Sequence, residues 1–340
     1  MTALAQTEPA STPEEAPAVE LLHISKSYPG VRANEDISLA LRRGEVHCLL
    51  GENGAGKSTL MGILAGMVQP DGGRIRVDGR DVRIRSPRAA LELGIGTVYQ
   101  HSTLIGALTV IDNLLLGDSR ALRVDVAGAR RRLEEFSSML GVAIDPRAKA
   151  RDLALGGQQQ VEIIKALWRG SRVLILDEPT SMLTPQAVRE LQTVLRRLRE
   201  HGLAIVFITH KLHEAVALGD RISILRAGRL TGAIEQERIR ESSPVELESE
   251  IVRLMFGEAL APAEEPAELH IGVEGRRAAR AASPEIALAL EHAHARGDGT
   301  QPGIEDVSLT LHFGEVLGIA GVDGNGQRAL AEAISGQRAL

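Results

Sequence analysis

The sequence predicts an α/β fold in which a largely parallel sheet carries a phosphate-binding loop. The first observation is an apolar run at residues 46–50 that leads directly into the glycine-rich segment 51–59. The second is another apolar run, which ends on the carboxylates of the segment 172–178. The third is an internal repeat, in which residues 305–336 resemble residues 35–66. Apolar runs of this length are typical of strands that are buried on both faces of a parallel sheet.

Residues 51–59 read GENGAGKST and fit the phosphate-binding pattern G-x-x-x-x-G-K-[ST]. Glycine allows backbone N–H groups to approach a phosphate closely, and the helix expected from Lys57 onward directs its positive N-terminus at the same point. The Lys57 ammonium is expected to contact the outer phosphates, and the Ser58 hydroxyl is placed to ligate Mg²⁺. An ordinary glycine-rich turn would not require all of these features together.

Length and composition set the broad class of protein. With 340 residues the chain has room for two domains of roughly 150 residues each. Its one cysteine, Cys48, lies in the apolar run before the loop, which favours a buried structural thiol and a reducing, cytosolic setting. The sequence has no apolar run of about 18 residues and no signal-peptide pattern, so we expect neither a membrane span nor secretion. A net charge of −6 and an aromatic content of 2% argue against a nucleic-acid partner.

Four parts are predicted along the chain. Residues 1–18 are rich in Ala, Pro, Thr and Glu and predict a disordered leader. Residues 19–256 contain the motifs and predict the first folded domain, which an amphipathic segment at 251–256 closes. Residues 257–283 mix Glu, Arg, Ala and Pro and predict a linker. Residues 284–340 contain the repeat and predict the N-terminal part of a second domain.

The first part of the folded domain predicts short strands separated by turns. Residues 21–24 and 37–41 are expected to be strands, and Tyr28 stands at the turn between them. Its ring can stack on an adenine or simply pack the turn, and the sequence leaves both roles open. Further strands are expected at 74–77 and 82–84, where charged and apolar residues alternate.

The middle of the domain changes from strand to helix. Residues 95–99 predict a strand that ends on Gln100. From about residue 109 to 168 the apolar period becomes helical, with a break at 145–146. The three arginines at 130–132 are expected to lie on a solvated face. This stretch therefore predicts a helical insertion in the α/β core.

The run at 172–178 predicts a strand that brings two carboxylates, Asp177 and Glu178, to the edge of the sheet. Ligands of open α/β sheets bind beyond the carboxyl ends of the strands, where the phosphate-binding loop also lies. Asp177 is therefore a candidate Mg²⁺ partner, and Glu178 is a candidate base that orients an attacking water. Two solvated acids are the alternative, which the Lys57 motif disfavours. His210 follows another apolar strand; it is either structural or placed to reach a γ-phosphate.

The repeat retains the loop glycines but loses the charged residue of the loop. A shift of 270 residues aligns 35–66 with 305–336 without a gap, and 13 of 32 positions are identical. The retained loop glycines are Gly321, Gly324 and Gly326. The lysine and serine positions are taken by Gln327 and Arg328, so nucleotide binding by this second loop stays open. The copy ends at Leu340 before a second pair of strand-end carboxylates, so we expect a fragment or truncation of a two-copy protein.

With these residues in view, residues 19–256 resemble the nucleotide-binding domain of ABC transporters. The resemblance implies a P-loop NTPase fold of ABC type, with a mixed or parallel sheet core, an antiparallel β-subdomain and a helical subdomain. It implies a Mg²⁺-dependent ATPase with ATP and Mg²⁺ as cofactors. The implied catalytic residues are Lys57, Glu178, which polarises water, and His210, which contacts the γ-phosphate. The implied Mg²⁺ ligands are Ser58, Gln100 and Asp177. The residues implied to bind ATP are Tyr28, Gly51, Glu52, Asn53, Gly54, Ala55, Gly56, Lys57, Ser58, Thr59 and Gln100.

Two positions depart from the family pattern. The family signature Leu-Ser-Gly-Gly-Gln corresponds to LALGG at residues 153–157, so Ala154 replaces the serine that would hydrogen-bond the γ-phosphate in a partner's site. Thr184 stands where aspartate is common. ATP sites of this family form between two domains, so Ala154 is expected to weaken the site that it shares with the Gln327 loop. A homodimer of first domains would present Ala154 to both sites, and we expect slow turnover from it.

A fused pair of domains with one degenerate half resembles the ATP-binding subunit of sugar and nucleoside importers. Residues 99–101 and 324–327 resemble the nucleoside branch more than the ribose branch. The resemblance implies ATP hydrolysis that energises import of a simple sugar or nucleoside. The implied partners are transmembrane permease subunits contacted through residues 100–116, a substrate-binding protein and a second nucleotide-binding domain. The implied location is the cytoplasmic face of the membrane.

Two other classes of function compete with this interpretation. The first is a soluble protein with twin ABC domains that acts on ribosomes or DNA; the net charge of −6 and Ala154 argue against it. The second is a regulator that binds ATP without hydrolysing it, because half of each composite site is weak or absent. Glu178 and His210 argue against the regulator for the first site.

Overall fold

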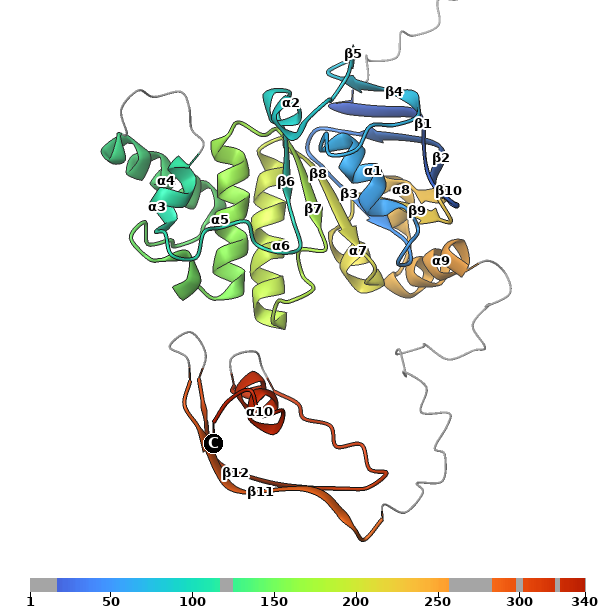
Figure 1. Cartoon of the computed structure of the whole chain (residues 1–340). Helices are drawn as coiled ribbons and strands as arrows, with labels where there is room; N and C mark the ends of the chain where they lie inside the picture. Colours follow the sequence, from blue (N-terminus) through green and yellow to red (C-terminus); the bar gives the residue numbers. More distant parts are fainter. Residues whose placement is uncertain (1–16, 117–124, 257–282, 298–301, 322–324, 340) are drawn as a thin grey trace, which may run out of the picture. The chain divides into compact units, whose positions relative to one another are not determined.

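The computed structural model describes residues 17–116, 125–256, 283–297, 302–321 and 325–339. The chain forms two compact units, Met1–Ala263 and Glu264–Leu340 (Figure 1). Almost all of the predicted leader and linker lies outside the described residues, and the predicted domain boundaries remain predictions.

The main sheet of the first unit is mixed, with mostly parallel strands. In spatial order its strands are β10 (Arg229–Ile234), β9 (Arg221–Arg226), β3 (Glu45–Leu50), β8 (Ala204–Thr209), β7 (Val173–Asp177) and β6 (Ile95–Val98). Neighbouring strands run parallel except β10, which pairs antiparallel with β9. The two apolar runs of the sequence are β3 and β7, with β8 between them. The predicted α/β class with a largely parallel sheet is confirmed.

A second, antiparallel sheet lies beside the main sheet. Its strands in spatial order are β2 (Val31–Leu41), β1 (Val19–Tyr28), β4 (Gly72–Val77) and β5 (Arg80–Val82). The strand predicted at 82–84 was wrong in its bounds. Pairing between β4 and β5 ends at the pair Ile75 and Val82, so residues 83 and 84 lie beyond the strand. The carbonyl of Ile84 instead accepts a hydrogen bond from the Gln69 side chain at 2.9 Å.

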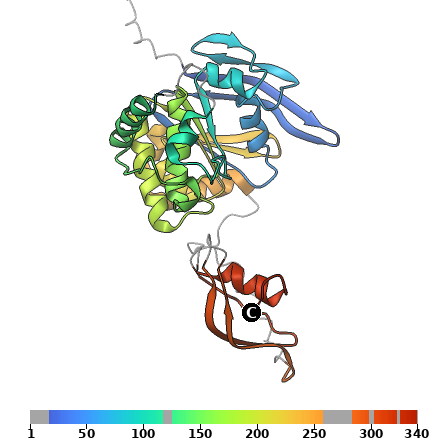
Figure 2. The same cartoon turned by 60° about the vertical axis from the view of Figure 1, so that its left-hand side comes forward.

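Two groups of helices complete the first unit. The helical insertion contains α3 (Val110–Leu115), α4 (Val126–Leu140), the short 3₁₀ helix η1 (Ala150–Asp152) and α5 (Leu155–Trp168). The other helices are α1 (Lys57–Leu64), α2 (Pro87–Glu92), α6 (Pro185–Glu200), α7 (Leu212–Leu218), α8 (Gln236–Glu241) and α9 (Pro244–Phe256). The antiparallel strands and the green helices of the insertion lie on opposite sides of this unit (Figure 2).

Two apolar cores cover the two faces of the main sheet. Side chains of α1, α2 and the antiparallel sheet form one core, which includes Leu49. Side chains of the helical insertion, α6, α7 and α9 form the other, which includes Cys48 and Leu50. The alternation along β3 follows from the two-residue period of a strand. Burial raises the pKa of the Cys48 thiol, as expected for a structural cysteine.

One expectation about the helical insertion was wrong. Arg132 does not lie on a solvated face: its guanidinium lies 4.5 Å from the centroid of the Trp168 ring and donates to the Trp168 carbonyl at 2.6 Å. Its neighbour Arg131 is exposed, as predicted. A guanidinium stacks readily on an aromatic face, so one arginine of the run serves packing between α4 and α5.

A buried polar cluster at the start of β3 makes stability depend on pH. Arg221 donates to Nδ1 of His47 at 2.7 Å, and Nε2 lies 2.9 Å from the Ser223 hydroxyl. Burial lowers the pKa of His47 below its ordinary value of 6.5, with Glu45 opposing the shift and Arg221 adding to it. The folded chain therefore keeps this ring neutral at pH values where the unfolded chain protonates it.

Lowering the pH below 6.5, the ordinary pKa of histidine, is therefore expected to destabilise the first unit. Because the unfolded chain binds a proton that the folded chain does not, the free energy of unfolding falls, by at most about 1.4 kcal/mol per pH unit for one group. His47→Gln should flatten this dependence in thermal unfolding between about pH 5 and 7. The exposed His213→Gln is the control, and an equal flattening in both variants would contradict the assignment.

The second unit repeats the antiparallel hairpin of the first. It contains β11 (Ile286–Ala295), β12 (Ile304–His312) and α10 (Gln327–Ile334). In both hairpins a histidine and an aspartate, each with positive φ, face each other across the two strands. In both, a serine hydroxyl also accepts a hydrogen bond from the backbone N–H of that histidine. The two sets are His23, Asp36 and Ser38, and His292, Asp306 and Ser308. The structural repeat therefore extends N-terminal to residues 35–66.

Candidate nucleotide site

The glycine-rich segment joins β3 to α1 through a turn that only glycine fits at two positions. A Cβ at Gly51 would lie 2.3 Å from the Leu225 carbonyl oxygen. At Gly56, where φ is +102°, a Cβ would lie 2.0 Å from the Ala33 carbonyl oxygen. Helix α1 begins at the next residue, so the backbone N–H groups of its first turn open onto the loop. The turn has the shape that a phosphate-binding cradle needs, and phosphate binding by it remains a prediction.

Lys57 is buried and folds back over its own loop. Its Nζ donates to the Gly51 carbonyl at 2.6 Å and to the Glu52 carbonyl at 2.9 Å. Burial lowers the pKa of Lys57, and the carboxylates of Glu178 and Asp177 oppose the shift. Such an ammonium, with two carbonyls as its hydrogen-bond acceptors, can exchange them for phosphate oxygens.

The remaining loop residues divide into an outer and an inner group. Those whose side chains are exposed are Glu52, Asn53 and Ser58, and Gly54 is exposed with them. Ala55 is buried, and Thr59 is partly buried. The Ser58 hydroxyl is thus accessible to a Mg²⁺ ion at the mouth of the loop, and the donor set fits a Mg²⁺-bound polyphosphate.

Two residues that hold the loop were not predicted from the sequence. Asn34, which is 1% exposed on β2, donates from Nδ2 to the Gly56 carbonyl at 3.1 Å. Gly228, in the turn between β9 and β10, donates from its backbone N–H to the Ala55 carbonyl at 3.0 Å. The available signals were the asparagine inside a strand and the Ala-Gly turn, but neither pointed to a loop so distant in the sequence.

The predicted carboxylates and histidine lie together at the carboxyl ends of neighbouring strands of the main sheet. β8 lies between β3 and β7, so the ends of the three strands that precede Lys57, His210 and Glu178 are neighbours. His210 Nδ1 lies 3.0 Å from Glu178 Oε1. Burial and then the nearby Glu178 raise the pKa of Asp177, while Lys57 opposes the shift. One cation and two acids therefore share one partly buried site.

Glu178 has a strained backbone. Its φ is +44°, in the left-handed region that residues other than glycine rarely adopt. Such conformations cost about 1–3 kcal/mol and are concentrated at functional sites. Its N–H donates to the Ile208 carbonyl at 3.1 Å, which ties it to β8.

Two other predicted residues, Gln100 and Tyr28, make no contact with Lys57, Glu178 or His210 that would fix their roles. Gln100 Nε2 lies 3.5 Å from the Ser181 hydroxyl, beside the segment that follows Glu178. Tyr28 is 43% exposed near the tip of the β1–β2 hairpin, with Lys26 Nζ 5.6 Å from its ring centroid. An adenine-stacking role for Tyr28 and a Mg²⁺ role for Gln100 remain predictions.

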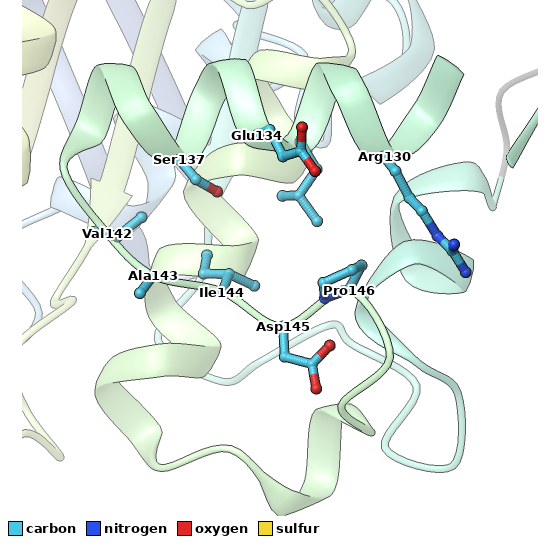
Figure 3. A pocket seen from close by; sticks show the side chains of 9 residues that line it. Arg130, Glu134, Ser137, Val142, Ala143, Ile144, Asp145 and Pro146 are labelled. Atoms are coloured by element: carbon cyan, nitrogen blue, oxygen red, sulfur yellow. The ribbon is translucent and has the colours of Figure 1, made fainter. Parts of the chain in front are cut away.

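A separate hollow of about 540 Å³ lies between α4 and the segment that follows it (Figure 3). Its lining residues are Arg130, Leu133, Glu134, Ser137, Val142, Ala143, Ile144, Asp145 and Pro146. None of the predicted site residues lines it, so it has no part in the nucleotide site.

Comparison with known proteins finds one matching family model and many similar proteins. Residues 34–181 match the family model described as ABC transporter. We call residues 34–181 the ABC domain after this match. The match begins at Asn34 and ends at Ser181, so it includes the glycine-rich loop and Glu178.

Proteins similar to this chain include ATP-binding proteins of importers. Ribose import ATP-binding protein RbsA 1 of Rubrobacter xylanophilus is 42% identical over 323 residues, which are 94% of this chain and 60% of that protein. Nucleoside import ATP-binding protein NupA of Lactococcus lactis subsp. cremoris is 37% identical over 94% of this chain and 60% of its own length. Guanosine import ATP-binding protein NupO of Bacillus subtilis is 41% identical over 94% of this chain and 59% of its own length. The chain thus spans about three fifths of these relatives.

Solved structures place the fold among ATP-binding cassettes. The ADP conformation of MJ1267, an ATP-binding cassette of an ABC transporter, has a TM-score of 0.61 and 22% identity, and covers 70% of this chain and 98% of its own. The cbiO1 structure from Clostridium perfringens has a TM-score of 0.60 and 25% identity, and covers 71% of this chain and 96% of its own. Among the residues that the structure describes, no helix has the length and apolar character of a membrane span.

Ala154 leaves helix α5 without a side-chain cap. It is the N-cap residue and has no side-chain hydrogen bond to the helix. Ala154→Ser is expected to stabilise the domain by about 0.5–1 kcal/mol, because serine can accept from a free N–H of the first turn. Thermal unfolding measures the gain. The control is Thr184→Ala, which removes the cap of α6 and should destabilise by a similar amount; stabilisation by both would refute the capping account.

Proposed function

We propose that the chain binds MgATP at residues 51–59 and hydrolyses it to energise import of a simple sugar or nucleoside through a membrane permease. The observation that carries the proposal is the convergence of Lys57, Glu178 and His210 at the ends of neighbouring strands. Support also comes from the ABC transporter match and from the import functions that the relatives' names state.

Each side chain takes a role that its position allows. Lys57 holds the outer phosphates, which replace the carbonyls of its own loop. Glu178 orients the attacking water and accepts its proton, and His210, 3.0 Å away, contacts the γ-phosphate. Ser58, Gln100 and Asp177 would hold Mg²⁺, which when bound neutralises charge on the phosphates.

The partners proposed are membrane permease subunits, a substrate-binding protein and a second nucleotide-binding domain, at the cytoplasmic face of the membrane. The relatives that the chain resembles are import ATP-binding proteins, and the chain spans about 60% of the first of them. In the second unit Gln327 begins α10 as Lys57 begins α1. A Cβ at Gly321 would lie 2.3 Å from Gln327 Nε2, so this side chain lies close to Gly321.

A charge on the surface proposed to contact the permease is expected to uncouple import from ATP binding. Ile105 is 49% exposed within residues 100–116. Ile105→Asp should abolish import by the complete transporter, while MgATP binding to this chain stays within about twofold of wild type, because an unpaired charge cannot dock in an apolar contact. Substrate uptake and MgATP titration measure the two effects.

The exposed Val245→Asp on α9, which lies outside that surface, is the control. Loss of MgATP binding in Ile105→Asp would reject the coupling surface, and retained import would reject the proposed contact. Wild-type chain that fails to bind MgATP would reject the proposed function itself.

A further inference from the structure

Glu214, on α7, is a buried carboxylate that joins two loops at the carboxyl edge of the main sheet. It is 1% exposed. Its Oε2 accepts hydrogen bonds from the Thr180 hydroxyl at 2.7 Å and the Thr209 hydroxyl at 3.1 Å. Its Oε1 accepts from Lys211 Nζ at 3.0 Å. Both carboxylate oxygens are therefore engaged with residues outside the helix or at its first turn.

These contacts flank the two residues of the proposed chemistry. Thr180 lies two residues after Glu178, and Thr209 directly precedes His210. Thr180 is itself 2% exposed, so its hydroxyl needs a buried partner. Lys211 adds a second bridge, because its Nζ also lies 3.3 Å from the Thr180 carbonyl. The loop after β7 and the loop after β8 are thus tied to each other through one carboxylate.

The tie explains how the strained backbone at Glu178 is held. A left-handed conformation at a residue other than glycine persists only where the surroundings fix it. On one side of Glu178 its N–H is bonded to Ile208. On the other side its carbonyl accepts from the Ser181 N–H at 3.2 Å, directly after the Thr180 contact. Without that contact, the segment after Glu178 would be free to relax.

We propose that Glu214 is a positioning residue that fixes the Glu178–His210 pair in its reactive geometry. The inference rests on the proposed function, because it assigns the pair to ATP hydrolysis. Glu214 touches neither reacting group, and it acts through Thr180 and Thr209. A purely structural role would be to satisfy two buried hydroxyls without effect on the chemistry.

Glu214→Gln and Thr180→Val in the full chain test this role, because each weakens the same contact with little change in volume. We expect the MgATP Kd to stay within about twofold and turnover to fall about 10- to 100-fold in both, since a small misplacement of reacting groups has effects of that size. The control is Asp220→Asn. Asp220 is another largely buried carboxylate, which accepts from the Val46 N–H and from Arg199 at the opposite edge of the sheet. The Asp220→Asn variant should have a lower thermal stability, and its turnover should stay within about twofold of wild type.

A double variant separates positioning from general destabilisation. If Glu214 acts by holding Glu178 in place beside His210, adding Glu214→Gln to Glu178→Gln should reduce the residual turnover by less than about twofold, because the carboxylate that it positions is already lost. A further loss equal to that of the single variant would overturn the proposal. So would a Glu214→Gln variant that turns over at the wild-type rate.

Amide exchange without nucleotide tests the geometry separately from the reaction. The Ser181 N–H, which donates to Glu178, should exchange about tenfold faster in Glu214→Gln and unchanged in Asp220→Asn. Unchanged exchange in Glu214→Gln would overturn the proposal. Faster exchange together with a wild-type chain that does not bind MgATP would support the positioning of this loop and reject the proposed function.

Discussion

Glu178→Gln is expected to reduce ATP turnover by roughly 10²–10⁴-fold, because glutamine cannot accept the proton of the attacking water. The Glu178 carboxylate lies 3.0 Å from His210 at the edge where β7 ends. Glutamine has nearly the same shape, so the backbone geometry of this residue should be retained. Steady-state hydrolysis and MgATP titration with the full chain measure the effect.

Binding separates this account from simple misfolding. The MgATP Kd of Glu178→Gln should stay within about threefold of wild type, since the lost interaction is made mainly in the transition state. Glu190→Gln on the exposed part of α6 is the matched control, because it makes the same chemical change away from the site. Turnover that survives in Glu178→Gln would mean that another group activates water.

Lys57→Ala is expected to weaken MgATP binding by about 30- to 150-fold, which corresponds to the loss of charge-assisted hydrogen bonds worth about 2–3 kcal/mol. The lysine is 6% exposed and already lies over the loop, so it needs no large movement to meet a phosphate. Titration with MgATP measures the change. The loop itself should persist, because its glycines and the contacts from other strands remain.

The matched control is Lys149→Ala, which removes an exposed lysine before η1. It should leave the MgATP Kd within about twofold. Equal weakening in the two variants would indicate a general electrostatic effect, and an unchanged Kd in Lys57→Ala would place nucleotide binding elsewhere on the chain.

Local patterns were enough to predict which candidate residues lie at strand ends. The apolar runs, the loop glycines and the acids after residue 176 each carry their signal within a few residues. Sheet topology then brought Lys57, Glu178 and His210 to one edge, as the rule for open α/β sheets predicts.

Contacts between distant segments could not be predicted in this way. Arg132 packs on Trp168, which is 36 residues away, and the charged run around it indicated only a solvated face. Asn34 and Gly228 hold the loop from positions that no local pattern connects to it. Glu214 was equally hidden, since an acid in the first turn of a helix is ordinary on its own.

The two outside contacts of the loop also affect how fast it can bind a ligand. Because Asn34 holds Gly56 and Gly228 holds Ala55, the loop is ordered when the chain folds and has little conformational entropy left to lose. Association then requires no slow search among loop shapes. The encounter rate with a polyphosphate should be set by diffusion and charge, and differences among ligands should appear mainly as differences in residence time.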